Sequence, residues 1–384
     1  MSNHAVLSPS SASRWLACTP SARLEALEPY TTSQYADEGT LAHRLADLFI
    51  NYRLGRILQK DYKKKLALIE KDELYTGEMY DYCEGYAVYV LELFNSLKGA
   101  HIFTEEKVDL SSVVPEGFGT VDIRIVAGDK LYIIDFKYGK GVPVFAAQSA
   151  QLKLYALGVY EEMKHLFNIK NTSLTIYQPR IDNVNTLEID VASLLIWQRD
   201  YVIPRAKLAD EGGGEFVPGT HCQFCKIKPK CKALADYNLK LAKSAFVDAD
   251  LLTPDEIAEI LKKEKFFTDW LTAVSDYAAD QAINHGVTWP GMKLVEGRSI
   301  RQYINETDVA LKLQDAGVKN GDIYKPLAVK GITEMTKALG KADFENLLSD
   351  LVHKPPGKPV LVPETDKRPA YGAAERAKNA FAKE

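Results

Sequence analysis

The chain of 384 residues contains few cysteines, methionines and tryptophans: five, five and four. It lacks an uninterrupted apolar run of about 18 residues, the minimum for a membrane-spanning helix, so we expect no membrane association. Its N-terminus shows no basic stretch followed by an apolar core, which argues against a signal peptide. We therefore expect a cytoplasmic protein. In that reducing compartment, clustered cysteines are more often metal ligands than disulfides.

The chain also lacks a strong excess of charge of either sign. It has 48 Lys and Arg against 52 Asp and Glu, a formal net charge of -4. This balance does not predict a protein that coats nucleic acid non-specifically, although it allows a local basic groove. A hydrophobic content of 46% and a charged content of 26% are ordinary for a globular protein. The length allows two or three domains.

Hydrophobic periodicity predicts both helices and strands in the first half of the chain. The predicted helices cover residues 8–28, 36–58, 72–98 and 145–167. The predicted strands cover residues 101–110, 119–126, 131–137 and 174–180. Between two of these strands the sequence AGDK predicts a hairpin turn, with Gly128 supplying the unusual dihedral angles. This order predicts an α/β protein with a mixed central sheet flanked by helices.

The second half of the chain reads as mainly helical beyond the flexible stretch EGGGE. Thr253 and Glu256 fit a capping box with Pro254 at the first helical position. That helix runs to residues 285–286 or breaks into a hairpin. Shorter predicted elements follow: a strand pair at 293–304 and helices around 307–316 and 342–352. We predict three domains: residues 1–244, a mainly helical accessory domain over 245–352, and an extended or partly disordered tail over 353–384.

Charged residues directly follow the apolar part of the strand YIIDFK. Asp135 and Lys137 are costly to bury unless something binds them. Asp122 lies on the partner strand of the predicted hairpin, so the two carboxylates should meet at one edge of the sheet, with Lys137 nearby. Paired carboxylates suit Mg²⁺ or Mn²⁺, which polarises a phosphoryl oxygen, while a lysine can orient water. The alternative is an ordinary Asp–Lys ion pair.

Two helices carry further candidate residues. Gln148, Gln151 and Tyr155 have the spacing of one polar face on the helix predicted after the hairpin. A solvated stripe is the alternative explanation for that face. His43 lies in EGTLAHRLADLF, and a lone helical histidine is not by itself a ligand.

Three cysteines with the spacing C-x₂-C-x₅-C predict a metal or cluster site; they are Cys222, Cys225 and Cys231. We assign Cys18 as the fourth ligand, because Cys83 lies in an apolar helix and suits a packed role. His221 is an alternative ligand. Four thiolates can hold Zn²⁺ or a [4Fe–4S] cluster, which would join the two ends of the intervening domain.

The combined motifs SPSSASRWLAC, EGTLAH, GTVDIRI, YIIDFK, QLKLY and CQFCKIKPKC resemble the PD-(D/E)XK nuclease superfamily. They are most similar to RecB-type exonucleases with an iron–sulphur staple, which include the CRISPR-adaptation exonuclease and the AddB nuclease domain. The resemblance covers about residues 8–235, and the whole chain further resembles a family of phage and prophage proteins. Two departures are the absence of a proline before Asp122 and an Asp rather than a Glu at position 135.

The resemblance implies a restriction-endonuclease-like fold with an iron–sulphur-stapled subdomain. It implies that a catalytic Mg²⁺ or Mn²⁺ is bound by His43, Asp122, Asp135 and the backbone carbonyl of Phe136. It further implies that Lys137 activates water and that Gln151 and Tyr155 position the substrate strand or support the metal. Glu105 or Glu106 could add an outer carboxylate. The structural [4Fe–4S] ligands would be Cys18, Cys222, Cys225 and Cys231, with Zn²⁺ as the alternative.

The function that the resemblance implies is metal-dependent DNA exonuclease activity in phage recombination, replication or repair. The expected partners are DNA and a phage single-strand-binding or recombination protein, and a ring or a dimer is compatible with this class. Two other hypotheses remain at the level of sequence. The chain could be a non-catalytic DNA-binding or assembly subunit that retains the nuclease fold, or a zinc-binding interaction protein.

Overall fold

The computed structural model describes residues 5–29, 32–244 and 253–292, together with the isolated residues 311, 314 and 340. The chain divides into two compact units, Met1–Val287 and Thr288–Glu384, and most described residues belong to the first. Apart from those isolated positions, the elements predicted beyond residue 292 lie outside the described residues. The three predicted domains therefore stay predictions.

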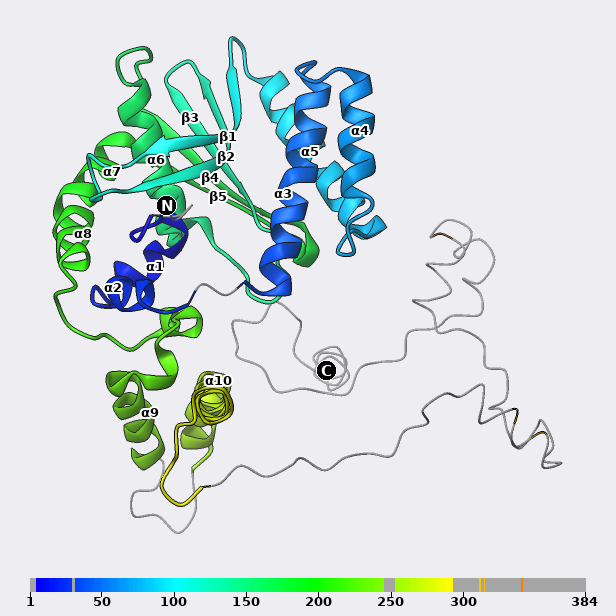
Figure 1. Ribbon diagram of the computed structural model, residues 1–384. Coiled ribbons are helices and arrows are strands. Elements are labelled where there is room, and N and C mark those ends of the chain that lie inside the picture. Colours follow the sequence, from blue (N-terminus) through cyan, green and yellow to red (C-terminus); the bar gives the residue numbers. More distant parts are fainter. Residues whose placement is uncertain are drawn as a thin grey trace, which may run out of the picture. The chain divides into compact units, whose positions relative to one another are not determined.

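A five-stranded mixed sheet forms the centre of the first unit (Figure 1). Its strands, in spatial and chain order, are β1 (His101–Asp109), β2 (Phe118–Ala127), β3 (Lys130–Phe136), β4 (Asn171–Gln178) and β5 (Asn183–Asp190). Strands β3 and β4 are parallel, and the other neighbours are antiparallel. The predicted mixed α/β class is confirmed. Strand β5 was not predicted.

The predicted hairpin between β2 and β3 sets the positions of the two aspartates. Gly128 in its turn has φ +60, in the left-handed region that glycine adopts without a Cβ penalty. Ile123 pairs with Ile134, so the next residues outward, Asp122 and Asp135, lie opposite each other at the open end of the hairpin. There the backbone N–H of Phe136 donates to Asp122 Oδ2 at 2.7 Å.

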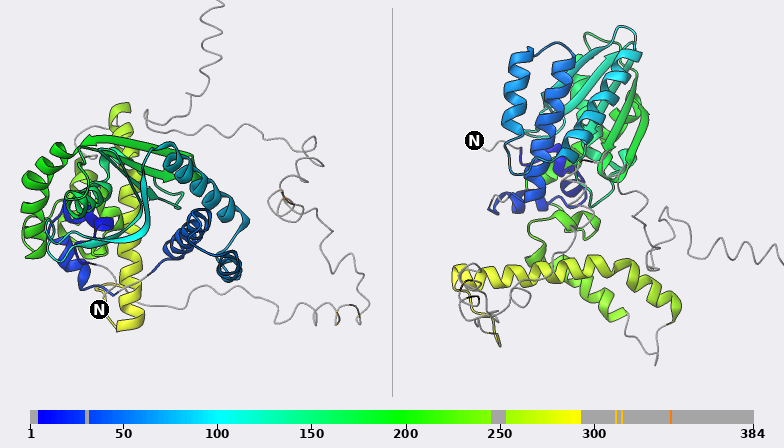
Figure 2. Two further views of the ribbon diagram at one scale, coloured as in Figure 1. Left: turned by 90° about the horizontal axis from the view of Figure 1, so that it is seen from above. Right: turned by 90° about the vertical axis from the view of Figure 1, so that its right-hand side faces the viewer.

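Helices cover both faces of the sheet, as the two views of Figure 2 show. One face carries α3 (Gln34–Arg53), α4 (Gln59–Ile69) and α5 (Gly77–Ser96), whose apolar side chains form one core with the sheet. The opposite face carries α6 (Ala150–Met163), which is the crossover between β3 and β4, and α7 (Val191–Trp197). The predicted helices that became α3, α5 and α6 are confirmed, whereas α4 was not predicted.

The single helix predicted over residues 8–28 is wrong. The structure has instead η1 (Pro9–Ser11), α1 (Ala12–Trp15) and α2 (Ser21–Ala26), with Cys18 in the turn between α1 and α2. Pro20 accounts for the break, because proline disfavours helical geometry in the preceding residue and lacks a backbone N–H. Trp15 is buried and donates from Nε1 to the carbonyl of Ser8 at 3.0 Å, which anchors this segment.

Two of the remaining described elements are short helical turns within the sheet region, and the others lead from the sheet to a long helix. They are η2 (Ala146–Gln148), η3 (Pro179–Ile181), η4 (Gln198–Val202), α8 (Ile203–Asp210), η5 (Thr220–Phe224), η6 (Lys228–Lys230), α9 (Lys232–Ser244) and α10 (Pro254–His285). Helix α10 begins with the predicted Thr253–Glu256 capping box and runs unbroken to Gly286, so the alternative of a helical hairpin is wrong. Within the described part of the chain, no helix has the length and apolarity needed to cross a membrane.

Candidate functional site

Three ligand-type side chains from three elements meet at the open end of the β2–β3 hairpin. His43 Nδ1, on α3, lies 3.4 Å from Asp122 Oδ1 on β2 and 3.4 Å from Glu105 Oε1 on β1. One ligand atom from each residue lies within 4.8 Å of the other two, a separation that allows one metal ion to contact all three. These residues form the candidate metal centre.

Glu105 reaches the metal centre through an unusual backbone conformation. Its φ is +48 although it lies within strand β1. The register is unbroken on both sides, with Thr104 opposite Ile123 and Glu106 opposite Val121, so Glu105 lies opposite Asp122. A left-handed non-glycine residue costs about 1 kcal/mol or more, and such residues cluster at functional sites. Of the two glutamates that the sequence offered, Glu105 is the one at the centre.

Glu106, in contrast, belongs to a separate ion-pair group. Its carboxylate pairs with Arg124, which also pairs with Glu162 on α6 at 2.6 Å. The Arg124 side chain is buried and lies over the Phe103 ring. This group ties β1, β2 and α6 together and explains why Glu106 is not available to a metal.

Asp135 and Lys137 form the ion pair that the sequence offered as one alternative. Asp135 is only 3% exposed, and its Oδ2 lies 2.9 Å from Lys137 Nζ. Lys137 Nζ also donates to Gln151 Oε1 at 3.0 Å, and Gln151 Nε2 donates to the hydroxyl of Tyr155 at 3.4 Å. The predicted catalytic residues therefore form a continuous polar chain from Asp135 to Tyr155. Gln148 is not part of it, because it lies in η2 before the helix and is exposed.

Electrostatics couple the members of the site. Burial alone would lower the pKa of His43, but the charges and hydrogen bonds of Asp122 and Glu105 raise it well above its usual value. Burial raises the pKa of Glu105, and His43 offsets this only in part. Burial would also raise the pKa of Asp122, but His43 and Lys137 hold it below its usual value. Of the two carboxylates, Asp122 is therefore the one whose ionised form the surroundings stabilise.

The pKa values of Asp135 and Lys137 are both raised above their usual values. Burial raises the pKa of Asp135, and the attraction of Lys137 does not fully offset this because Asp122 is also close. Burial would lower the pKa of Lys137, yet the charges of Asp135 and Asp122 raise it above the usual lysine value. Lys137 therefore stays an ammonium group at neutral pH, with a partly exposed side chain.

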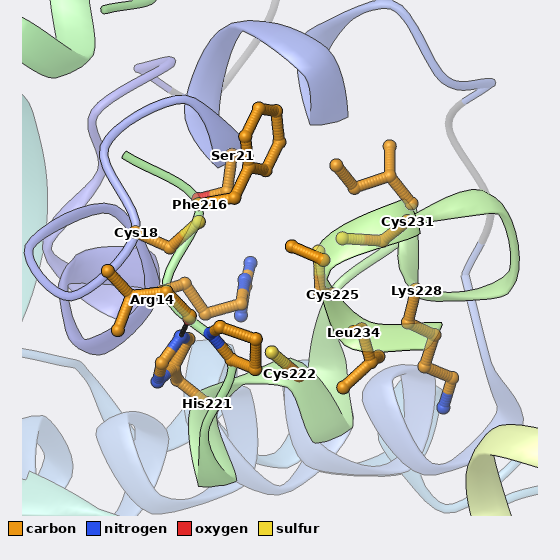
Figure 3. Close-up of a pocket in the computed structure, with 14 residues that line it drawn as sticks. Arg14, Cys18, Ser21, Phe216, His221, Cys222, Cys225, Lys228, Cys231 and Leu234 are labelled. Carbon is orange, nitrogen blue, oxygen red and sulfur yellow. Dashed lines mark hydrogen bonds between the residues drawn. The ribbon is translucent and has the colours of Figure 1, made fainter. Parts of the chain in front are cut away.

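The second candidate site is a pocket lined by four of the five cysteines, here called the cysteine pocket. Figure 3 shows the side chains of Cys18, Cys222, Cys225 and Cys231 around one space. Cys18 therefore lines the same pocket as the three later cysteines, and the predicted role of the four as ligands stays a prediction. The fifth cysteine, Cys83, is fully buried on α5 and donates from Sγ to the carbonyl of Ala42 at 3.3 Å. This agrees with the packed role predicted for it.

His221 also lines the cysteine pocket, but its ring nitrogen Nε2 is 2.8 Å from the carbonyl of Val217. Burial raises the pKa of the thiols of Cys18 and Cys222, and that of Cys225 to about 12. Without a metal these thiols are therefore protonated. A bound metal would have to displace their protons, so binding depends on pH.

Hydrogen bonds hold the two chain segments of the cysteine pocket together independently of any metal. Glu25 on α2 accepts from the backbone N–H of Lys226 at 2.8 Å and from Arg14 Nε at 3.0 Å. Thr19 Oγ1 donates to the carbonyl of Gly213 at 2.7 Å, and Arg205 Nη2 donates to the carbonyl of Ala17 at 3.1 Å. The turn that carries Cys18 is therefore fixed against α8 and the later cysteines.

These observations define a class: a mixed α/β protein with a His–Glu–Asp candidate metal centre at one edge of the sheet and a four-cysteine pocket at the junction of distant segments. The chain belongs to the family described as "Protein of unknown function (DUF2800)", whose model matches residues 4–369. A solved structure titled "Crystal structure of SSO0001" is similar at 17% identity, covering 57% of this chain and 95% of that one, with a TM-score of 0.24. A TM-score this low does not establish a shared fold.

Proposed function

We propose that the protein is a Mg²⁺- or Mn²⁺-dependent DNA exonuclease of the PD-(D/E)XK type. The observation that carries the proposal is the meeting of His43, Asp122, Asp135 and Lys137 at one edge of the sheet. Each residue was singled out by a motif; His43 comes from α3, and the other three come from the β2–β3 hairpin and the residue that follows it. An ordinary surface ion pair would not require a histidine and a second aspartate beside it.

The donor set fits a hard divalent cation. His43 and Asp122 would hold it, together with Glu105 or Asp135 and the predicted backbone carbonyl of Phe136. Carboxylate and carbonyl oxygens suit Mg²⁺ and Mn²⁺. Asp135 Oδ2 is buried and, among the described residues, receives no hydrogen bond beyond its ion pair with Lys137. A divalent cation polarises a phosphoryl oxygen and makes a bound water more acidic.

Lys137 would position the attacking water and stabilise the negative charge that develops on the scissile phosphate. Asp135 and Gln151 contact its Nζ from two sides, at 2.9 and 3.0 Å, and so fix the ammonium group before substrate arrives. Tyr155 in turn contacts Gln151, so that Gln151 and Tyr155 act as positioning residues for Lys137 or for the substrate strand. Preorganised charge of this kind is a large contribution to catalysis.

A [4Fe–4S] cluster is the proposed occupant of the cysteine pocket, with a structural role. Cys18 and the three later cysteines line one pocket, so four thiolates are available to a single group. Four thiolates suit a [4Fe–4S] cluster or Zn²⁺, and the resemblance of the motifs is the reason for proposing the cluster. Iron and sulphide analysis of an anaerobic preparation tests this, because stoichiometric zinc in a colourless sample would contradict it.

The biological setting that we propose is phage DNA recombination, replication or repair in the host cytoplasm. DNA is the proposed substrate, and a phage single-strand-binding or recombination protein is the proposed partner. Ring and dimer are the oligomeric states to test. These proposals derive from the resemblance of the motifs alone.

The test is degradation of end-labelled linear DNA and of circular DNA, single- and double-stranded, with Mn²⁺ or Mg²⁺ supplied. We expect nucleotide release from linear ends and none from circles. Asp135→Asn should abolish release, whereas Asp129→Asn, an exposed residue at the other end of the same hairpin, should not change it. Equal activity of Asp135→Asn and wild type would contradict the proposal. A wild type that binds DNA without degrading it would favour a non-catalytic DNA-binding subunit.

A further inference from the structure

A buried tyrosine of α5 has no partner for its hydroxyl group. Tyr86 is 2% exposed, and its hydroxyl oxygen is fully buried without a hydrogen bond among the described residues. Its ring is nevertheless well fixed. It stacks on Phe136 with 4.5 Å between ring centroids and an interplanar angle of 16°, and it packs against Tyr177 at 5.1 Å. Packing alone would be served equally well by phenylalanine.

Tyr86 lines the same small pocket as the candidate metal centre. That pocket is lined by His43, Ala46, Asp47, Ile50, Tyr86, Glu105, Asp122, Ile123 and Phe136. Tyr86 therefore shares a pocket with the carboxylates of Glu105 and Asp122, and its hydroxyl group forms no hydrogen bond with them. Buried polar groups in native proteins are almost always paired, and an exception indicates an ordered water, an ion or a functional role.

The hydroxyl group of Tyr86 can act as a hydrogen-bond donor. A phenol carries its proton at physiological pH, so Tyr86 presents an O–H group inside the protein. A neutral phenol cannot replace a carboxylate as a ligand, but it can donate to an oxygen atom that is itself a ligand.

We propose that Tyr86 is a positioning residue of the metal centre. Its hydroxyl group donates a hydrogen bond to a water molecule held in the pocket between Tyr86 and the carboxylates of Glu105 and Asp122. That water orients the oxygen ligands of the cation. The inference rests on the proposed function, because it requires a divalent cation at the centre, but the residue lies outside the predicted ligand set.

Tyr86→Phe isolates the hydroxyl group, because it keeps the stacked ring. Tyr89→Phe is the matched control: Tyr89 lies on the same helix and packs against Tyr177, but it does not line the metal pocket. The measurements are the Mn²⁺ dissociation constant of the full-length protein without DNA, from the electron paramagnetic resonance signal of free Mn²⁺, and the Tm with and without added Mn²⁺.

We expect Tyr86→Phe to weaken Mn²⁺ binding about tenfold, the usual scale for residues that orient metal ligands. Without added Mn²⁺ its Tm should stay close to that of wild type, because the hydroxyl group forms no hydrogen bond to another described residue. Tyr89→Phe should bind Mn²⁺ as wild type does. Unchanged Mn²⁺ affinity in Tyr86→Phe would overturn the inference, as would a lower Tm without Mn²⁺ than Tyr89→Phe shows, since the hydroxyl group would then be structural.

The outcome separates this inference from the proposed function. If wild type binds Mn²⁺ and degrades DNA while Tyr86→Phe binds Mn²⁺ equally well, only the role of Tyr86 is wrong. If wild type binds neither Mn²⁺ nor Mg²⁺, the metal centre itself is wrong and both fail.

Discussion

The metal centre and the cysteine pocket both gather ligand-type residues from distant parts of the chain, but they are built on different supports. The metal-centre residues His43, Glu105 and Asp122 lie on α3, β1 and β2, and Asp135 lies next to Asp122 on β3; all four elements are regular and are held by the sheet and its core. The cysteines lie in a turn, in η5 and at the ends of η5 and η6. Short helical turns of this kind bury little apolar surface of their own.

The two regions also differ in how far their charges are balanced without a metal. In the metal centre, His43 and Lys137 already neutralise neighbouring carboxylates. In the cysteine pocket, burial raises the thiol pKa of Cys18 and Cys225, so these thiols are neutral in the absence of a metal. We infer that a metal adds chemistry to the first region, which is already folded, and adds folding free energy to the second.

The largest expected effect comes from removing a ligand of the cysteine pocket. Cys225→Ser should abolish iron binding and lower the Tm by roughly 10 °C, because several kcal/mol of metal-linked folding free energy is lost. Metal analysis and thermal unfolding measure the two effects. Mn²⁺ affinity of the protein that remains folded should not change.

Cys83→Ala is the control for that experiment, since it removes a buried cysteine outside the pocket. It should retain full iron content even though it costs stability through a cavity. Loss of iron in Cys83→Ala, or its retention in Cys225→Ser, would contradict the assignment of the four ligands.

The second-largest expected effect is on the rate of DNA hydrolysis, with no expected loss of folded structure. Lys137→Gln should reduce the rate of DNA hydrolysis by about 10²- to 10³-fold, the usual cost of losing one preorganised charge at a reacting centre. Iron content should stay at the wild-type level, because this side chain does not line the cysteine pocket. Lys140→Gln, an exposed lysine three residues further on, should leave the rate unchanged. Equal losses in both variants would indicate general attraction of DNA instead of a specific role.

The third effect separates backbone strain from metal binding. Asparagine tolerates the left-handed region better than other non-glycine residues, so Glu105→Asn should preserve or raise the Tm without metal. It should weaken Mn²⁺ binding about tenfold, because a carboxylate is lost from the centre. Glu116→Asn is a matched control, since Glu116 also has a positive φ, +51, but is exposed and outside the centre. If both variants bind Mn²⁺ as wild type does, Glu105 is not a ligand.

The same contrast explains which features could be predicted from the sequence. The AGDK turn between two apolar strands determines the register, and with it the meeting of Asp122 and Asp135. The spacing of the later cysteines and the Thr253 capping box are also local patterns, and the structure contains both. Features that depend on local periodicity and turn chemistry were therefore predictable.

Other features depend on tertiary packing and have no local pattern. Nothing in HIFTEEKVDL predicts that Glu105 instead of Glu106 adopts a left-handed conformation, because the position of Asp122 on the next strand is decisive. Strand β5 alternates polar and apolar residues and follows the turn at Pro179–Ile181, but it was not predicted. Tyr86 is one of 20 tyrosines, and only the three-dimensional pocket distinguishes it from the others.

The smallest expected effect tests whether the two regions are independent. Thr19→Val keeps the shape of a buried side chain but removes its hydrogen bond to the carbonyl of Gly213, which should cost about 1 kcal/mol and about 2–4 °C in Tm. Iron content should stay near the wild-type level, since the bonds of Glu25 and Arg205 still hold the Cys18 turn. Mn²⁺ affinity should not change, because no metal-centre residue contacts Thr19 through these bonds. A loss of Mn²⁺ affinity in Thr19→Val would mean that the turn and the sheet edge are coupled, and the division into a preformed centre and a metal-dependent staple would then be wrong.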